Sequence, residues 1–117
     1  MRYKKFIIIR KNNDFEIRLG YPFFHIDLID NGEKNNVTVY GGGFWDLDFE
    51  NKKINLFGTS SDFGKPFKRD ILIAIKNMDN HKWWQFSWIC ERIFGKEYPD
   101  IDFDNMEKEF KFNIQYD

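Results

Sequence analysis

The fold is decided by the stretch Asn36–Trp45 (NVTVYGGGFW), in which a strand-like, β-branched run leads into three consecutive glycines. A second glycine-rich segment, Phe57–Gly64 (FGTSSDFG), follows another strand-like run, Lys53–Phe57. Glycine-rich turns form where the backbone adopts positive φ or approaches a ligand closely, and that ligand is commonly a small anion when Ser and Thr lie among the glycines. The sequence therefore predicts two glycine-rich turns that bracket a short strand and cradle a phosphate group.

Length and composition indicate one folded domain, 1–117, with a core rich in aromatic rings, because the chain has 117 residues and 20% of them are aromatic. Lys and Arg number 18 against 19 Asp and Glu, so the net charge of -1 provides no general attraction for nucleic acid or for an anionic membrane. The single Cys90 cannot form an intramolecular disulfide, and no signal segment or long apolar run is present. We therefore expect a cytoplasmic protein without a membrane span.

Hydrophobic patterning predicts a mostly antiparallel sheet of about five or six strands. The runs Lys5–Lys11 and Phe15–Leu19 predict a hairpin across a polar turn. The runs Asn36–Tyr40 and Lys53–Phe57 predict a second antiparallel pair, and the alternating tail Glu109–Tyr116 predicts a closing strand.

Two helices are predicted between the last two of these strands. The first covers Phe67–Lys76, and the second covers residues 83–93, where apolar residues repeat at three- and four-residue spacing. A strand over Trp84–Trp88 is the alternative for the second helix. The earlier segment Phe23–Asp30 fits either a strand or one to two helical turns. Together these elements predict an α+β fold.

The chain has two histidines, and their sequence contexts differ. His81 lies in a polar connector, whereas His25 lies in an aromatic and aliphatic run. A neutral imidazole can take a proton from water or attack phosphorus, and its ordinary pKa of about 6.5 suits both roles near neutral pH. A purely structural, buried histidine is the alternative interpretation of His25. No Cys-x-x-Cys or His-x-x-x-His spacing occurs, so we expect no metal and no other cofactor.

A tryptophan cluster formed by Trp83, Trp84 and Trp88 could stack on nucleobases or sugars. The nearby Asp79 and Glu91 and the lack of a basic patch argue against nucleic acid. Core packing or a protein interface fits the cluster better.

Four blocks of the chain, in order, are similar to the phosphohistidine phosphatase family, also called Janus/Ocnus. The blocks are KFIIIR at 5–10, FHIDLID at 24–30, GGG at 41–43 and KINLFGTSSDFG at 53–64. The resemblance implies the family's α+β fold and a metal-independent phosphatase activity. It also implies that the substrate is a protein phosphohistidine, a phospholysine or a small phosphoramidate, bound by a protein that we expect to be a monomer.

The resemblance also implies roles for individual residues. His25 matches the catalytic histidine, acting as general base or nucleophile. Lys5 and Ser60 match side chains that contact the substrate phosphate, and the backbone N–H groups of Ile26 and Asp62 match phosphate donors. The glycines of the supporting turns are Gly41, Gly42, Gly43, Gly58 and Gly64.

The chain departs from the family pattern in four places. Phe44 stands where the family usually has an arginine, and Asp62 occupies a position of a small residue. The connection from His25 to the triple glycine is shorter than in the family, and Tyr98-Pro99-Asp100 comes later, which implies an aromatic-rich insertion around 78–97. The alternative function is therefore a weak or inactive relative, acting as a protein-binding or immunity-type module through Trp83, Trp84 and Trp88.

Overall fold

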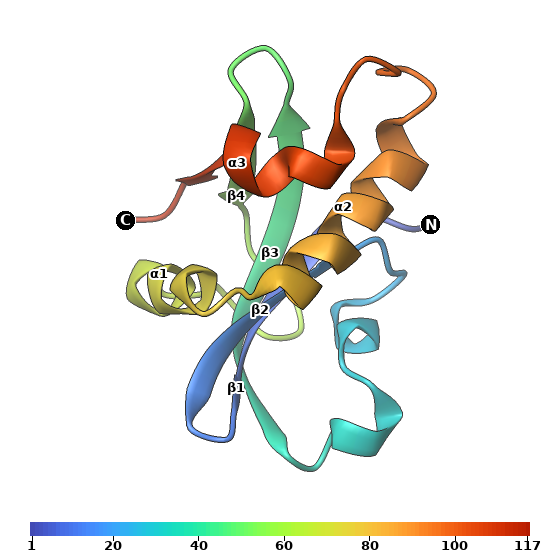
Figure 1. The fold of residues 1–117 in the computed structure, drawn as a ribbon. Coiled ribbons are helices and arrows are strands. Elements are labelled where there is room, and N and C mark those ends of the chain that lie inside the picture. Colours follow the sequence, from blue (N-terminus) through green and yellow to red (C-terminus); the bar gives the residue numbers. More distant parts are fainter.

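The computed structural model describes residues 1–117 and contains one five-stranded sheet in the order β2-β1-β3-β4-β5 (Figure 1). The strands are β1 (Lys5–Lys11), β2 (Asp14–Gly20), β3 (Val37–Asp48), β4 (Lys53–Phe57) and β5 (Lys111–Ile114). The helices are α1 (Lys68–Lys76), α2 (Asn80–Phe94) and α3 (Met106–Glu109), and the 3-10 turns are η1 (His25–Leu28), η2 (Asn31–Glu33) and η3 (Phe103–Asn105). All strand pairs are antiparallel except β4 with β5. The predicted α+β fold is confirmed.

The hairpin of β1 and β2 closes through a two-residue turn, since Lys11 pairs with Asp14. Asn12 and Asn13 both have left-handed φ, at 53° and 67°. A tight turn with two positive φ angles matches the natural twist of the flanking strands, and asparagine tolerates this conformation better than most residues. The polar turn predicted from the sequence therefore fixes the register of the hairpin.

The triple glycine is not a turn, so that prediction is wrong. Gly41–Gly43 lie inside β3, which runs from Val37 through to Asp48. Ile7 pairs with Gly42 but Ile9 pairs with Val39, so β3 has one residue more than β1 in this interval. The extra residue forms a β-bulge, and Gly41 accommodates it with a φ of 119°. The second segment, after β4, is a turn as predicted, with Gly58 at φ 78° and Gly64 at φ 80°.

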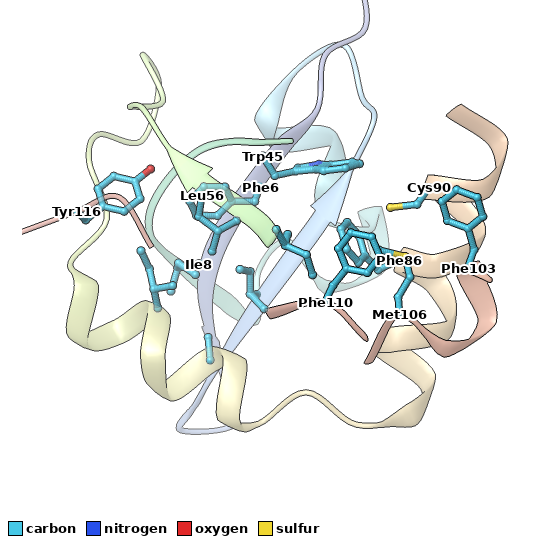
Figure 2. Close-up of a cluster of buried hydrophobic side chains, with 14 residues drawn as sticks. Phe6, Ile8, Trp45, Leu56, Phe86, Cys90, Phe103, Met106, Phe110 and Tyr116 are labelled. Carbon is cyan, nitrogen blue, oxygen red and sulfur yellow. The ribbon is translucent and has the colours of Figure 1, made fainter. Parts of the chain in front are cut away.

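The two faces of the sheet are covered differently. Phe6 and Ile8 of β1 point into the main core, which α1, α2 and α3 cover on one face of the sheet (Figures 1 and 2). Ile7 and Ile9 point to the opposite face, because side chains alternate along a strand. There they pack with Ile29 and with neighbouring residues of the η1 segment and of the turn after β4. The second, smaller layer carries the candidate site.

Helix α2 confirms the predicted second helix, so the alternative strand over Trp84–Trp88 is wrong. Asp79 caps its start by accepting a hydrogen bond from the Lys82 N–H at 2.9 Å. Phe86 and Cys90 face the core (Figure 2). There the rings of Phe86 and the buried Trp45 pack edge to face, with 4.9 Å between their centres. The segment implied to be an insertion is therefore mostly a core-forming helix.

The ambiguous segment Phe23–Asp30 forms the 3-10 turn η1, so its helical alternative is confirmed. Arg18 of β2 anchors this segment by donating to the Leu28 carbonyl at 3.1 Å and by pairing with Glu33. Lys11 donates to the same carboxylate at 2.8 Å. The Arg18 guanidinium, followed by Lys11, holds the pKa of Glu33 well below its usual range. This ion-pair network ties the η1–η2 segment to the hairpin.

Replacing Gly43 with alanine should destabilise the sheet. An added Cβ would lie 2.3 Å from the Tyr116 hydroxyl oxygen and 2.5 Å from the Phe57 carbonyl oxygen. Overpacking of this kind typically costs about 1–3 kcal/mol. Urea unfolding followed by circular dichroism measures the loss. Gly32→Ala is the matched control, because a Cβ there meets nothing within 4 Å. Equal unfolding midpoints for the two variants would contradict the tight packing at Gly43.

Candidate functional site

A cavity of about 340 Å³ gathers residues from four separate parts of the chain, 1–5, 23–25, 44 and 59–62. Lys5 comes from the start of β1, His25 from η1 and Asp62 from the turn after β4. These are three of the site residues predicted from the sequence. The other residues of the lining are Met1, Tyr3, Phe23, Phe24, Phe44, Thr59 and Ser61.

His25 is 5% exposed and is fixed by one hydrogen bond, between its Nε2 atom and the Gly43 carbonyl oxygen at 2.8 Å. A carbonyl oxygen can only accept, so Nε2 carries the proton and Nδ1 carries the lone pair of the neutral ring. Nδ1 has no partner in the chain. It is not fully buried either, because Asp70 Oδ1 is the only fully buried side-chain polar atom without a partner. The free nitrogen of this histidine is therefore chemically available.

The surroundings of His25 favour its neutral form. Burial lowers the pKa of the imidazole below its usual range, and the nearby Lys5 ammonium lowers it further. The hydrogen bond to Gly43 and the Asp62 carboxylate act in the opposite direction without cancelling this effect. At neutral pH the ring is thus uncharged and its lone pair is free for base or nucleophile chemistry.

The His25 ring packs directly on the backbone of the triple glycine. A Cβ on Gly42 would lie 3.1 Å from the His25 Cδ2 atom and 2.7 Å from the Phe6 carbonyl oxygen, so only glycine lets the ring settle on the strand. Gly42 also anchors the turn after β4: its N–H donates to the Gly64 carbonyl at 3.0 Å, and its carbonyl accepts from the Ser60 N–H at 2.8 Å. Gly42 and Gly43 therefore position both halves of the cavity.

Lys5 provides the only lysine or arginine side chain of the cavity lining. Its Nζ donates one hydrogen bond to the Phe23 carbonyl and lies 5.7 Å from the centre of the Tyr3 ring. An ammonium group has three donors, so this geometry leaves donors for a bound anion. Phe44 pairs directly opposite Lys5 in the sheet, and its ring centre lies 5.5 Å from that of His25. Phe44 thus contributes an apolar wall to the cavity.

Ser60 lies outside the lining of the cavity. It is 1% exposed, and its Oγ accepts from the N–H groups of Asp62 at 3.3 Å and Phe63 at 3.1 Å. The serine therefore shapes its own turn, and it engages the Asp62 N–H that the resemblance assigns to phosphate. Thr59 and Ser61 line the cavity instead, although Ser60 is the only hydroxyl of this turn that the resemblance assigns to phosphate. No sequence signal separates these positions, because the segment is a turn without regular alternation and the consecutive Ser61 and Asp62 both line the cavity.

Ile26 also lies outside the lining, and its backbone N–H makes no hydrogen bond within the chain. Nowhere in the structure do three or more His, Cys, Asp or Glu side chains form a group that could hold a metal ion. None of the helices has the length and apolar character required to cross a membrane.

No protein-family model matches this sequence, and no curated protein matches it. The similarity to the phosphohistidine phosphatase family stays a prediction.

The arrangement combines a neutral imidazole, the Lys5 ammonium, the hydroxyls of Tyr3, Thr59 and Ser61, and the Asp62 carboxylate within aromatic walls. The imidazole suits proton transfer or nucleophilic attack, and the ammonium suits an anionic group placed next to it. The Asp62 carboxylate repels a highly charged anion, which limits the affinity of the cavity for free phosphate. Tyr3, Phe23, Phe24 and Phe44 offer apolar surface to the remainder of a substrate.

Proposed function

We propose that this protein is a metal-independent phosphatase that hydrolyses the P–N bond of a phosphoramidate. The substrate is a phosphohistidine or phospholysine side chain of a protein, or a small phosphoramidate. One observation carries the proposal: His25 is held as a neutral ring with an available Nδ1, in a cavity whose single lysine is Lys5. The similarity of the four sequence blocks to the phosphohistidine phosphatase family supports it.

The residues can act in either of two ways. As a base, His25 Nδ1 takes a proton from water while the water oxygen forms a bond to phosphorus and the P–N bond breaks. The imidazolium then returns that proton to the departing nitrogen, so the products are the amine and inorganic phosphate. As a nucleophile, Nδ1 itself bonds to phosphorus while the P–N bond breaks and the departing nitrogen takes a proton from water; water then hydrolyses the phosphorylated ring to inorganic phosphate and the free imidazole. In both cases the Lys5 ammonium offsets charge on the phosphoryl oxygens.

Hydrolysis of phosphoramidate in the presence of a chelator tests the proposal. Wild-type protein should release phosphate and ammonia at equal rates, and Lys5→Met should lower kcat/KM by about 10²-fold because an electrostatic donor is lost. Phosphate release is followed by ³¹P NMR, which reports substrate and product in one measurement.

Lys4→Met is the matched control for Lys5. The Lys4 ammonium lies over the Phe94 ring at 5.7 Å from its centre, and Lys4 does not line the cavity, so the same change of charge one residue away should leave kcat/KM unchanged. Absence of turnover by the wild-type protein, or equal losses in the two variants, would refute the proposed phosphatase site.

A further inference from the structure

The outer face of α2 carries two exposed tryptophans that the phosphatase site does not use. Trp84 is 74% exposed and Trp88 is 59% exposed, and their four-residue spacing places them side by side on the helix. Trp83, in contrast, is half-buried and packs on Phe112 with 5.6 Å between ring centres. The predicted surface cluster is therefore a pair rather than a trio.

The two tryptophans line a groove of about 440 Å³ together with Glu91 of the same helix and Asp104 of η3. Neither carboxylate takes part in an ion pair within the chain. Glu91 lies seven residues after Trp84, so it continues the same face of the helix. Exposed aromatic rings and unpaired carboxylates thus meet in one groove.

The segment that supplies Asp104 is strongly acidic. Residues 97–109 contain one basic residue, Lys108, and six acidic ones: Glu97, Asp100, Asp102, Asp104, Glu107 and Glu109. Phe103 is buried in the main core, which secures this acidic segment beside α2 (Figure 2). The chain as a whole has a net charge of only -1, so the negative charge is concentrated locally.

An internal contact places a guanidinium group on one of these two rings. The Arg92 guanidinium carbon lies 4.8 Å from the centre of the Trp88 ring, within the range of a cation–π interaction. Trp84 has no such cation from its own chain, and its ring is the more exposed of the two. Arg92, which lies over the Trp88 ring, and His81, which lines the groove, are the basic side chains that α2 itself presents there.

We propose that the groove of Trp84, Trp88, Glu91 and Asp104 binds a basic polypeptide segment of a partner protein. An arginine or lysine side chain of the partner stacks on Trp84 and pairs with the two carboxylates. The groove lies on the helical layer, whereas the His25 cavity lies on the opposite face of the sheet. The docking site is therefore independent of the phosphatase proposal, and either can fail without the other.

Titration of ¹⁵N-labelled protein with a peptide of alternating arginine and glycine tests this inference. The indole N–H resonances of Trp84 and Trp88 should shift in a saturable way, while those of Trp45 and Trp83 should stay in place. The interaction should weaken with added salt because it is partly electrostatic. Trp84→Ala, and separately the double variant Glu91→Gln with Asp104→Asn, should each weaken binding about tenfold.

Two controls make the result specific. A peptide of alternating glutamate and glycine should produce no shift, and Glu50→Gln, which does not line the groove, should bind like the wild type. Equal shifts with the acidic peptide, or no shift with the basic one, would overturn the inference. Saturable binding of cellohexaose instead, or indole shifts that depend only on protein concentration, would assign the groove to a sugar or to a second copy and would equally overturn it.

Discussion

Substitution of His25 with asparagine is expected to lower phosphoramidate hydrolysis by about 10²- to 10⁴-fold, the range typical of a lost general base. The asparagine side chain has no nitrogen lone pair that can accept a proton or bond to phosphorus, and its amide is too short to reach the position of Nε2, so the hydrogen bond to the Gly43 carbonyl is lost as well. The rate therefore reports the lost chemistry, and the stability of the variant reports the lost hydrogen bond. Initial rates and the thermal unfolding midpoint are measured on the same preparation.

His81→Asn is the matched control, because His81 is the only other histidine of the chain. It is exposed on α2, where its Nε2 atom lies 2.8 Å from Nε2 of Gln85. This variant should hydrolyse phosphoramidate at the wild-type rate. If wild-type and His25→Asn proteins were equally active, the assignment of His25 would be wrong, and the buried ring would have only a structural role.

The pH dependence of phosphoramidate hydrolysis should reflect the lowered pKa of His25. Protonation of Nδ1 removes the lone pair, so kcat/KM should be constant near neutral pH and should fall in acid, with a pKa below the usual 6.5. The same shift affects stability. The unfolded chain, with its ordinary pKa, takes up the proton before the folded chain does, so stability decreases as pH falls below 6.5. His25→Asn should lose this part of the pH dependence.

The second large effect is expected at Glu33, where replacement by glutamine should cost about 3 kcal/mol of unfolding free energy. The side chains of Glu33 and Arg18 are 10% and 14% exposed, so the change leaves a nearly buried guanidinium without its main counter-charge. Lys11 loses its partner as well. Denaturation by urea at pH 7 measures the difference. Because Arg18 also donates to the Leu28 carbonyl, the variant should also loosen the turn that carries His25.

Glu16→Gln is the appropriate comparison for Glu33. Glu16 also pairs with Arg18 and with Lys82, but its side chain is 26% exposed, so its removal should cost only about 1 kcal/mol. Because the pKa of Glu33 is lowered in the folded protein, the carboxylate contributes fully to the free energy of unfolding above the ordinary carboxyl pKa of 4.5. This contribution is lost progressively as the pH falls below 4.5. Wild type and Glu33→Gln should therefore converge in stability in acid. A difference that persisted unchanged in acid would contradict the ion-pair explanation.

Local patterns predicted much of this fold from the sequence. The hairpin of Lys5–Lys11 with the next strand, and the apolar stripe of α2, depend on residues near one another in the chain, and both are present. The bulge at Gly41 was missed because it depends on register against a distant strand. The parallel docking of β5 on β4 is non-local in the same way, and sequence periodicity carries no information about it.

Some residues of the candidate site could be predicted from the sequence, and others could not. Lys5 and His25 were predicted, and both line the cavity. Ser60 was also predicted, but the direction of its side chain is decided by hydrogen bonds inside its own turn. Residue type alone could not distinguish it from its neighbours Thr59 and Ser61.

Two adjacent residues in the bulged centre of β3 hold both walls of the cavity. Gly43 accepts the hydrogen bond from His25, and Gly42 is hydrogen-bonded through its N–H and its carbonyl to the turn after β4. The spacing between the imidazole and the turn is therefore a property of the sheet backbone, not of the loops. Exchanging the exposed turn residues, such as Ser61 or Asp62, can alter what the cavity accepts while the histidine keeps its place.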